Sequence, residues 1–184
     1  MSAVSAMSAM SAVTAVIAAL CGAAAGAGCG RAGAAPERSS GIVPPTGWQS
    51  MASVAATARL ALGPGTEVEG AEAWGEPAMG CYAVWLALRA SGTAEAVGKQ
   101  VVAGFTGAAG AAGSGSGAKL IVKDVVAPTG DEGVLTLAFE RGDHRGRLRA
   151  RLGGGRIAAL ACFANQREPL ACEAACTKLL GAQP

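Results

Sequence analysis

The sequence predicts an α+β domain in which helices pack on an antiparallel sheet that includes a C-terminal four-strand meander. In the second half of the chain, strand-like runs are separated by short turns that contain Gly, Asp and Pro. Stripes of apolar residues with helical spacing occur before, between and after these runs. Four cysteines follow the first thirty residues, so two disulfides are expected to staple the domain.

The domain is expected to begin with a helix and two strands. Ser50 is predicted to cap a helix that runs to about Leu62 and stops at the Gly-Pro-Gly turn of residues 63–65. Residues 68–74 and 80–89 then have the pattern of two strands. The second strand is apolar on both faces, which is typical of a central strand covered from both sides.

The remaining elements are a helix, four strands and a final helix. Thr93 is expected to cap the first of these helices, and the Gly-, Ala- and Ser-rich residues 107–117 predict a mobile loop. The four strand-like runs are 119–126, 133–141, 145–152 and 156–163. Connections as short as theirs join antiparallel neighbours. The last helix is predicted over 170–180, with Pro169 at its start and Gly181 as its stop.

The composition limits both the core and the classes of partner. Hydrophobic residues make up 51% of the chain, but nearly half of them are alanines, and aromatic residues make up only 4% of the chain. Such a core buries little area per residue, so covalent staples would add usefully to its stability. Lys and Arg number 15 against 13 Asp and Glu. This balance gives no general reason to expect nucleic acid or a membrane surface as a partner.

The first segment is typical of a secretory signal peptide. Residues 1–28 contain no Asp, Glu, Lys or Arg, and an apolar run over residues 10–20 is followed by small residues up to Gly28. Apolar residues followed by small ones are the pattern that signal peptidases cleave, although the positive charge here is only the terminal amine. The apolar run is too short to span a membrane well. We therefore predict export, with residues 1–28 as the signal peptide.

Cys29 is a candidate for lipid attachment. Ala27 and Gly28 precede it, as small residues precede the cysteine of a bacterial lipobox, but Gly26 stands where a Leu is usual. Lipidation would anchor the protein to the membrane; simple cleavage nearby would leave it soluble in the periplasm. Residues 29–46 are expected to be a flexible tether and 47–184 the single folded domain. The expected location is the periplasm or the outer membrane.

The four later cysteines predict two structural disulfides. Cys172 and Cys176 are four residues apart and share one face of the final helix, whereas Cys81 and Cys162 lie on predicted strands. We expect Cys81 and Cys162 each to pair with one of the two helical cysteines. A zinc site made of these thiols, with or without His144, is the less favoured alternative because close Cys pairs are missing. A thioredoxin-type redox site is also disfavoured, because the spacing of the helical pair is one residue too long.

A row of arginines is the main candidate binding feature. Arg145, Arg147, Arg149 and Arg151 alternate with smaller residues, so a strand places all four on one face. One interpretation is a solvated face with ordinary ion pairs. The other is a face that binds anions, because arginine holds planar anions with two hydrogen bonds. The acidic residues of the first half are expected to meet this row across the sheet or in another molecule; they are Glu67, Glu69, Glu72 and Glu76.

No catalytic, cofactor or metal motif is evident. His144 is the only histidine and lies in a Gly-Asp-His turn without a recognisable nucleophile. The Gly-rich residues 113–119 differ from a phosphate loop because the lysine is displaced and a strand follows. An enzyme would instead need paired carboxylates, for which Glu72, Glu76 and Asp143 are the candidates.

The last third of the chain resembles a known family. Residues 146–152 (Gly-Arg-Leu-Arg-Ala-Arg-Leu) and 153–162 (Gly-Gly-Gly-Arg-Ile-Ala-Ala-Leu-Ala-Cys), together with Gly47-Trp48, are similar to the PsbP-like domains of small bacterial envelope lipoproteins. The resemblance implies an antiparallel sheet between helices and an accessory or binding role, without catalytic residues to carry over. The expected function is therefore an exported, non-enzymatic binding or accessory module of the envelope. A small periplasmic enzyme and a self-associating structural protein are the alternatives.

Overall fold

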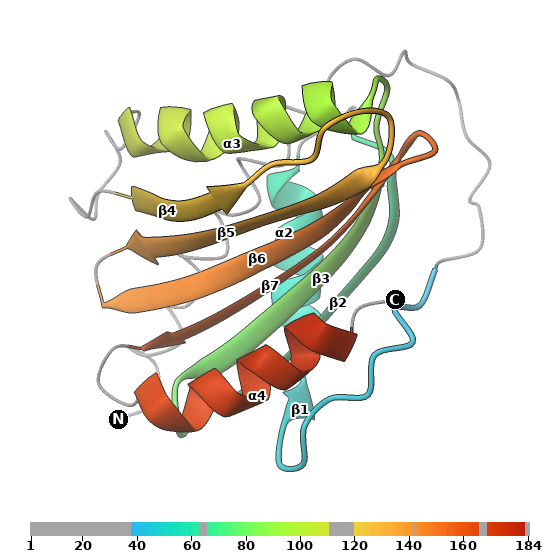
Figure 1. Ribbon diagram of the computed structural model, residues 1–184. Helices are drawn as coiled ribbons and strands as arrows, with labels where there is room; N and C mark the ends of the chain where they lie inside the picture. Colours follow the sequence, from blue (N-terminus) through green and yellow to red (C-terminus); the bar gives the residue numbers. More distant parts are fainter. Residues whose placement is uncertain (1–37, 63–65, 111–119, 142, 166–168, 183–184) are drawn as a thin grey trace.

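A seven-stranded antiparallel sheet forms the centre of the protein (Figure 1). The computed structural model describes residues 38–62, 66–110, 120–141, 143–165 and 169–182. The predicted signal peptide, residues 1–28, and Cys29 lie outside these residues. The strands are β1 (Gln49–Ser50), β2 (Val68–Glu76), β3 (Cys81–Arg89), β4 (Leu120–Val126), β5 (Gly133–Arg141), β6 (His144–Gly153) and β7 (Arg156–Asn165), in the spatial order β1-β2-β3-β7-β6-β5-β4. The helices described are α2 (Ala52–Ala61), α3 (Ala94–Gly110) and α4 (Pro169–Ala182).

Strand β3 is the buried centre of the sheet. It pairs with β2 on one side and β7 on the other, and every one of its residues except Arg89 is buried. This agrees with the sequence prediction of a central strand covered on both faces. The antiparallel sheet, the helices and the two joined cysteine pairs together make an α+β fold, as predicted.

Helices α2 and α3 cover one face of the sheet. Their apolar stripes enclose the larger core, in which Phe105 of α3 lies 6.0 Å from Phe139 of β5, measured between ring centroids. Tyr82 and Phe163 stack within the same core with their centroids 5.5 Å apart. Aromatic pairs at such distances add stability beyond their buried area, which matters in a chain with so few aromatic rings.

Helix α4 and the segment that precedes β1 cover part of the other face. In Figure 1, α4 crosses in front of the sheet and α2 lies behind it. Trp74, Trp85 and Leu160 of the sheet are buried here together with Leu179 of α4 and Ile42 of the preceding segment. This smaller core lies over β2, β3 and β7, which leaves the other strands less covered on this side.

Several predicted boundaries differ from the structure. Thr93 does cap α3, because its hydroxyl oxygen accepts a hydrogen bond from the amide of Ala96 at 3.2 Å. Ser50, however, belongs to β1, and α2 starts after Met51 without a side-chain cap. Pairing of Ser50 with Trp74 in the sheet explains why it is not available as a cap. Gly181 lies inside α4 and does not stop it, since the helix continues to Ala182.

The end of the predicted tether, residues 38–46, lies against the domain. Ile42 is buried in the smaller core, and the backbone amide of Ser40 donates to a carboxylate oxygen of Glu72 at 3.0 Å. The hydroxyl of Ser40 donates to the other oxygen of the same carboxylate. The predicted mobile loop was expected to begin at residue 107, but α3 extends to Gly110. Residues 111–117 of that loop lie outside the described part.

Two disulfides join α4 to the middle of the sheet. Cys81 of β3 is bonded to Cys172, and Cys162 of β7 is bonded to Cys176, with Cα–Cα distances of 5.4 and 5.5 Å. The prediction that each strand cysteine pairs with one helical cysteine is confirmed. The zinc alternative is wrong, because all four sulfur atoms that it needs are used in these bonds.

Removal of the two disulfides should have unequal effects on stability. The bridges close loops with sequence separations of 91 and 14 residues. In the chain-entropy model, such loops stabilise the folded state by about 4.6 and about 3 kcal/mol. Cys81→Ala with Cys172→Ala should therefore lower the free energy of unfolding by about 1.5 kcal/mol more than Cys162→Ala with Cys176→Ala. Urea unfolding of the two double variants measures this difference, and equal losses would contradict it.

A candidate anion-binding face beside helix α4

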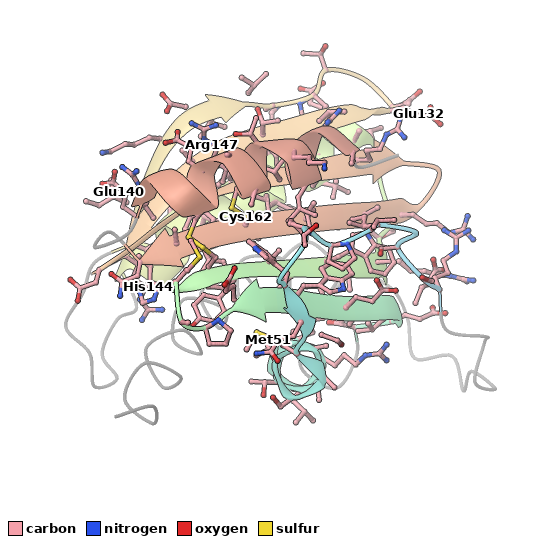
Figure 2. All side chains as sticks on the ribbon, turned by 90° about the horizontal axis from the view of Figure 1, so that it is seen from below. Met51, Glu132, Glu140, His144, Arg147 and Cys162 are labelled. Carbon is pink, nitrogen blue, oxygen red and sulfur yellow. A yellow bond between two sulfur atoms is a disulfide. The ribbon has the colours of Figure 1, made fainter. Side chains whose placement is uncertain are left out.

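The four arginines of the row lie on the same face of the sheet as α4. Pairing of β6 with β7 sets Arg147 opposite Cys162 and Arg149 opposite Leu160, both of which face α4. The residues between the arginines point into the larger core; they are Leu148, Ala150 and Leu152. Figure 2 shows Arg147 beside α4, with Cys162 beneath the helix.

The part of this face over β4, β5 and β6 is only partly covered. Ile121 and Val126 of β4 are 45% and 62% exposed, and Thr136 and Ala138 of β5 are half-buried. A groove of about 180 Å³ runs between these strands and α4. Its lining includes Ala138, Glu140, Arg145, Arg147, Phe163, Glu173 and Thr177. The groove therefore combines an apolar floor with charged walls, which is the usual composition of a ligand site.

Three of the four arginines contact α4. Nη2 of Arg147 donates to Oε1 of Glu173 at 3.3 Å, and Nη2 of Arg145 lies 4.0 Å from Oε2 of the same carboxylate. Arg149 donates to the backbone carbonyl of Leu180 at 2.7 Å. That carbonyl lies in the last turn of α4, where a positive charge is favourable because of the helix dipole. These arginines thus help to position the helix.

Arg151 differs from the other three. It is exposed, and its guanidinium forms no hydrogen bond or ion pair with the described residues, although its backbone pairs with Val134 and Ala158 in the sheet. It lines a separate hollow with Arg38, Glu132, Gly153, Arg156 and Ala158, which we call the arginine hollow. Figure 2 shows that Glu132, at this hollow, and Glu140, at the groove, lie at opposite ends of the sheet. The row therefore connects two separate depressions of one face.

Within the molecule, the acidic residues of the first half do not contact the row, which corrects the expectation of a contact across the sheet. Glu69 instead forms ion pairs with three other arginines, at 2.9 Å to Nε of Arg89, 3.2 Å to Nε of Arg156 and 3.8 Å to Nε of Arg38. Glu67 pairs with Arg89 as well. The reason is the order of the strands, because β3 and β7 separate β2 from β6.

The pKa of Glu69 is lowered by this arrangement. Burial of its carboxyl, which is 9% exposed, acts to raise the pKa. Hydrogen bonds from Arg89 and Arg156 and the charges of Arg156 and Arg38 outweigh burial, so the carboxylate form is favoured. A single carboxylate thus ties together the segment before β1, the end of β3 and the start of β7.

Asp124 is a feature of the groove that the sequence gave no reason to single out. It has a positive φ of 51°, the only such value outside glycine among the described residues. It lies at an irregularity in the pairing of β4 with β5, between Lys123 and Val126, and it lines the groove. Bulges often redirect a side chain next to a binding site. The sequence of β4 looks like a regular strand, so it does not reveal this irregularity in the pairing.

His144 is buried and lies apart from the groove. Its ring is 5% exposed and meets Phe163 edge-on, with the centroids 6.4 Å apart. Burial lowers the pKa of His144, which outweighs the opposing charge of Asp143. His144 is the first residue of β6, not part of the predicted turn, and a buried imidazole against a phenyl ring is a packing residue.

The candidate carboxylates of an enzyme are not brought together. Glu72 accepts the hydrogen bonds of Ser40, and Glu76 ends β2 opposite Cys81. Asp143 precedes β6, which lies three strand spacings, about 14 Å, from β2. No cluster of three or more potential metal ligands occurs in the described part of the chain, and none of its helices is long and apolar enough to cross a membrane.

Comparison with known proteins adds no family. No protein-family model matches the sequence, and no curated protein is significantly similar to it.

Replacement of Glu69 should destabilise the protein more than replacement of its neighbour Glu67. Glu69→Gln removes the charge that three guanidinium groups share, which should lower the free energy of unfolding by about 1 to 3 kcal/mol. Glu67→Gln removes a carboxylate that is 41% exposed and should change it by less than about 0.5 kcal/mol. Urea unfolding at neutral pH compares the two. Equal effects would show that the shared carboxylate has no special role.

His144 should make stability depend on pH just below neutrality. Its pKa in the folded state lies below the ordinary value of 6.5, so its contribution is present above pH 6.5 and is lost as the pH falls through and below that value. His144→Phe keeps an aromatic ring there but removes the titration. The variant should lose less stability than the unaltered protein between pH 8 and pH 5 in urea unfolding. Identical losses would assign the dependence to other groups.

Proposed function

We propose that this protein is an exported, non-enzymatic binding module of the bacterial cell envelope, held near the membrane by a lipid on Cys29. The open face beside α4 binds an anionic component of the envelope. The face carrying the arginine row, with the groove and the arginine hollow, is the binding surface.

The proposed location is supported by the disulfides. Bonds of this kind form and persist in oxidising compartments, of which the bacterial periplasm is one. Both bridges are structural, since they join α4 to β3 and β7. The signal-like residues 1–28 and the cysteine that follows them supply the route and the anchor.

The observation that carries the binding proposal is the unequal covering of the sheet. One face is closed by α2 and α3, whereas the other is open over β4 to β6. The charges on and beside this open part are Lys123, Arg145, Arg147, Arg149 and Arg151 against Asp124, Glu140 and Glu173. The excess of two positive charges, next to apolar side chains, favours an anionic ligand that also has an apolar part.

The sheet between helices also supports the proposed relationship to PsbP-like domains. In that family the architecture serves accessory and binding roles, so the proposed function needs no catalytic residues. The distribution of carboxylates supports the same conclusion, because the candidate acids Glu72 and Asp143 lie on separate parts of the sheet.

Loss of two row arginines should weaken binding to an anionic envelope surface. We would replace Arg145 and Arg151 with Gln, since Arg147 and Arg149 also hold α4. The loss of Arg151, which has no ion pair, costs about 1 kcal/mol near an anionic surface, and the loss of Arg145, which lies 4.0 Å from Glu173, costs less, so binding should fall roughly fivefold or more. The probes are isolated cell-wall sacculi and phosphatidylcholine vesicles with and without phosphatidylglycerol, with binding measured by co-sedimentation.

The control removes the same charge from the opposite face. Arg59→Gln with Lys99→Gln alters α2 and α3 and should leave binding nearly unchanged. All proteins carry Cys29→Ser, so that no attached lipid contributes to binding. Equal losses of binding in both double variants would show that only the net charge of the protein matters. That result would contradict the proposal that one face binds the anion.

A further inference from the structure

Arg151 and two other arginines converge at the arginine hollow from separate parts of the chain. Arg38 comes from the segment before β1, Arg151 from the end of β6 and Arg156 from the start of β7. Arg151 is paired with Ala158 in the sheet, so Arg156 is its diagonal neighbour on the same face. Diagonal neighbours are within reach of each other's long side chains. One ligand in the hollow can therefore meet more than one guanidinium group.

The guanidinium groups of the hollow are not fully used by the protein. Arg38 and Arg156 share the carboxylate of Glu69 with Arg89, and their side chains remain 55% and 48% exposed. Each guanidinium has five N–H donors, so one shared carboxylate leaves many of them for a ligand. The guanidinium of Arg151 has no hydrogen bond or ion pair among the described residues.

The charges around the hollow leave one positive charge in excess. The positive groups are Arg38, Arg89, Arg151 and Arg156, and the negative groups are Glu67, Glu69 and Glu132. Glu132 is the acid that lines the hollow itself, where it packs against the backbone of Gly153. An excess of one charge suits an anion that carries a single negative charge.

The wall of the hollow beside the turn from β6 to β7 has no side chains. Gly153 and Gly154, which line the hollow, and Gly155 all have positive φ, which turns the chain tightly. A Cβ atom at Gly154 would meet nothing within 4 Å, whereas one at Gly153 would meet the side chain of Glu132 at 2.7 Å. The wall is therefore open at Gly154 and covered by Glu132 at Gly153.

We propose that the arginine hollow binds the phosphodiester of an anionic phospholipid head group. This inference rests on the proposed function, because it places the chain at a membrane surface. Arg38 follows the proposed lipid-bearing Cys29 by nine residues, which span at most about 30 Å when extended. The hollow therefore stays near the head groups of the membrane that holds the anchor. The planar fork of arginine matches two phosphate oxygens at once.

Two single variants separate the hollow from the rest of the row. Arg151→Gln should weaken binding to phosphatidylglycerol-containing vesicles about fivefold, which corresponds to the loss of about 1 kcal/mol. Arg145→Gln removes the same charge at the groove and should weaken it less than twofold. Glu132→Gln removes the acid of the hollow and should strengthen binding. All three are made in the full chain with Cys29→Ser, and urea unfolding checks that each variant is folded.

The outcomes distinguish the hollow from the general proposal. Equal losses of vesicle binding from Arg151→Gln and Arg145→Gln, or no gain of binding from Glu132→Gln, would show that the hollow is not the binding site. The open face would still stand as a binding surface. Equal binding to vesicles whose charge comes from oleate would overturn the preference for a phosphodiester. Binding to sacculi without binding to vesicles would overturn the lipid ligand alone, and binding to neither would overturn the proposed function too.

Discussion

The attachment of α4 to the sheet is the constraint on which this structure depends. The helix shares only the smaller core with the sheet, in which Leu179 is buried together with Trp85 and Leu160. Two disulfides, four residues apart on the helix, fix both its position and its rotation relative to β3 and β7. Arg147 and Arg149 add an ion pair and a hydrogen bond along its open side. In a protein with a larger apolar core, packing alone would hold such a helix. In this chain, which has few aromatic residues, the disulfides hold it.

This attachment also determines which surface remains available to a ligand. One disulfide joins α4 to β3 and the other joins it to β7. The helix is therefore held over one half of this face of the sheet and cannot move across to β4 and β5. The groove between the helix and β5 to β6 is therefore formed before any ligand arrives. A preformed site loses little conformational entropy on binding. The two disulfides therefore account both for the rigidity of this small domain and for the groove.

The sequence predicted what depends on local pattern and missed what depends on strand order. The apolar character of both faces of β3 predicted the central strand. The four-residue spacing of Cys172 and Cys176 on one helix face predicted that each pairs with a cysteine of the sheet. The expected contact of the acidic cluster with the row across the sheet was wrong, because no local pattern shows that β3 and β7 lie between β2 and β6. Ser50 was misassigned because pairing with β2 overrides its preference for a helix cap. Asp124 was missed because a bulge breaks the alternation from which faces are deduced.

The arginine row shows why residue type alone does not define a site. Its four members have the same spacing and face, yet three contact α4 and only the guanidinium of Arg151 is left without a partner among the described residues. What distinguishes Arg151 is its position beyond the end of the helix, next to the turn into β7. The same end of the sheet receives Arg38, where the chain from the N-terminal segment reaches the domain through the backbone hydrogen bond between Arg38 and Glu69. The point where a membrane anchor would pull on the domain is therefore close to the unpaired guanidinium of Arg151, so that tethering and head-group binding would act at one place.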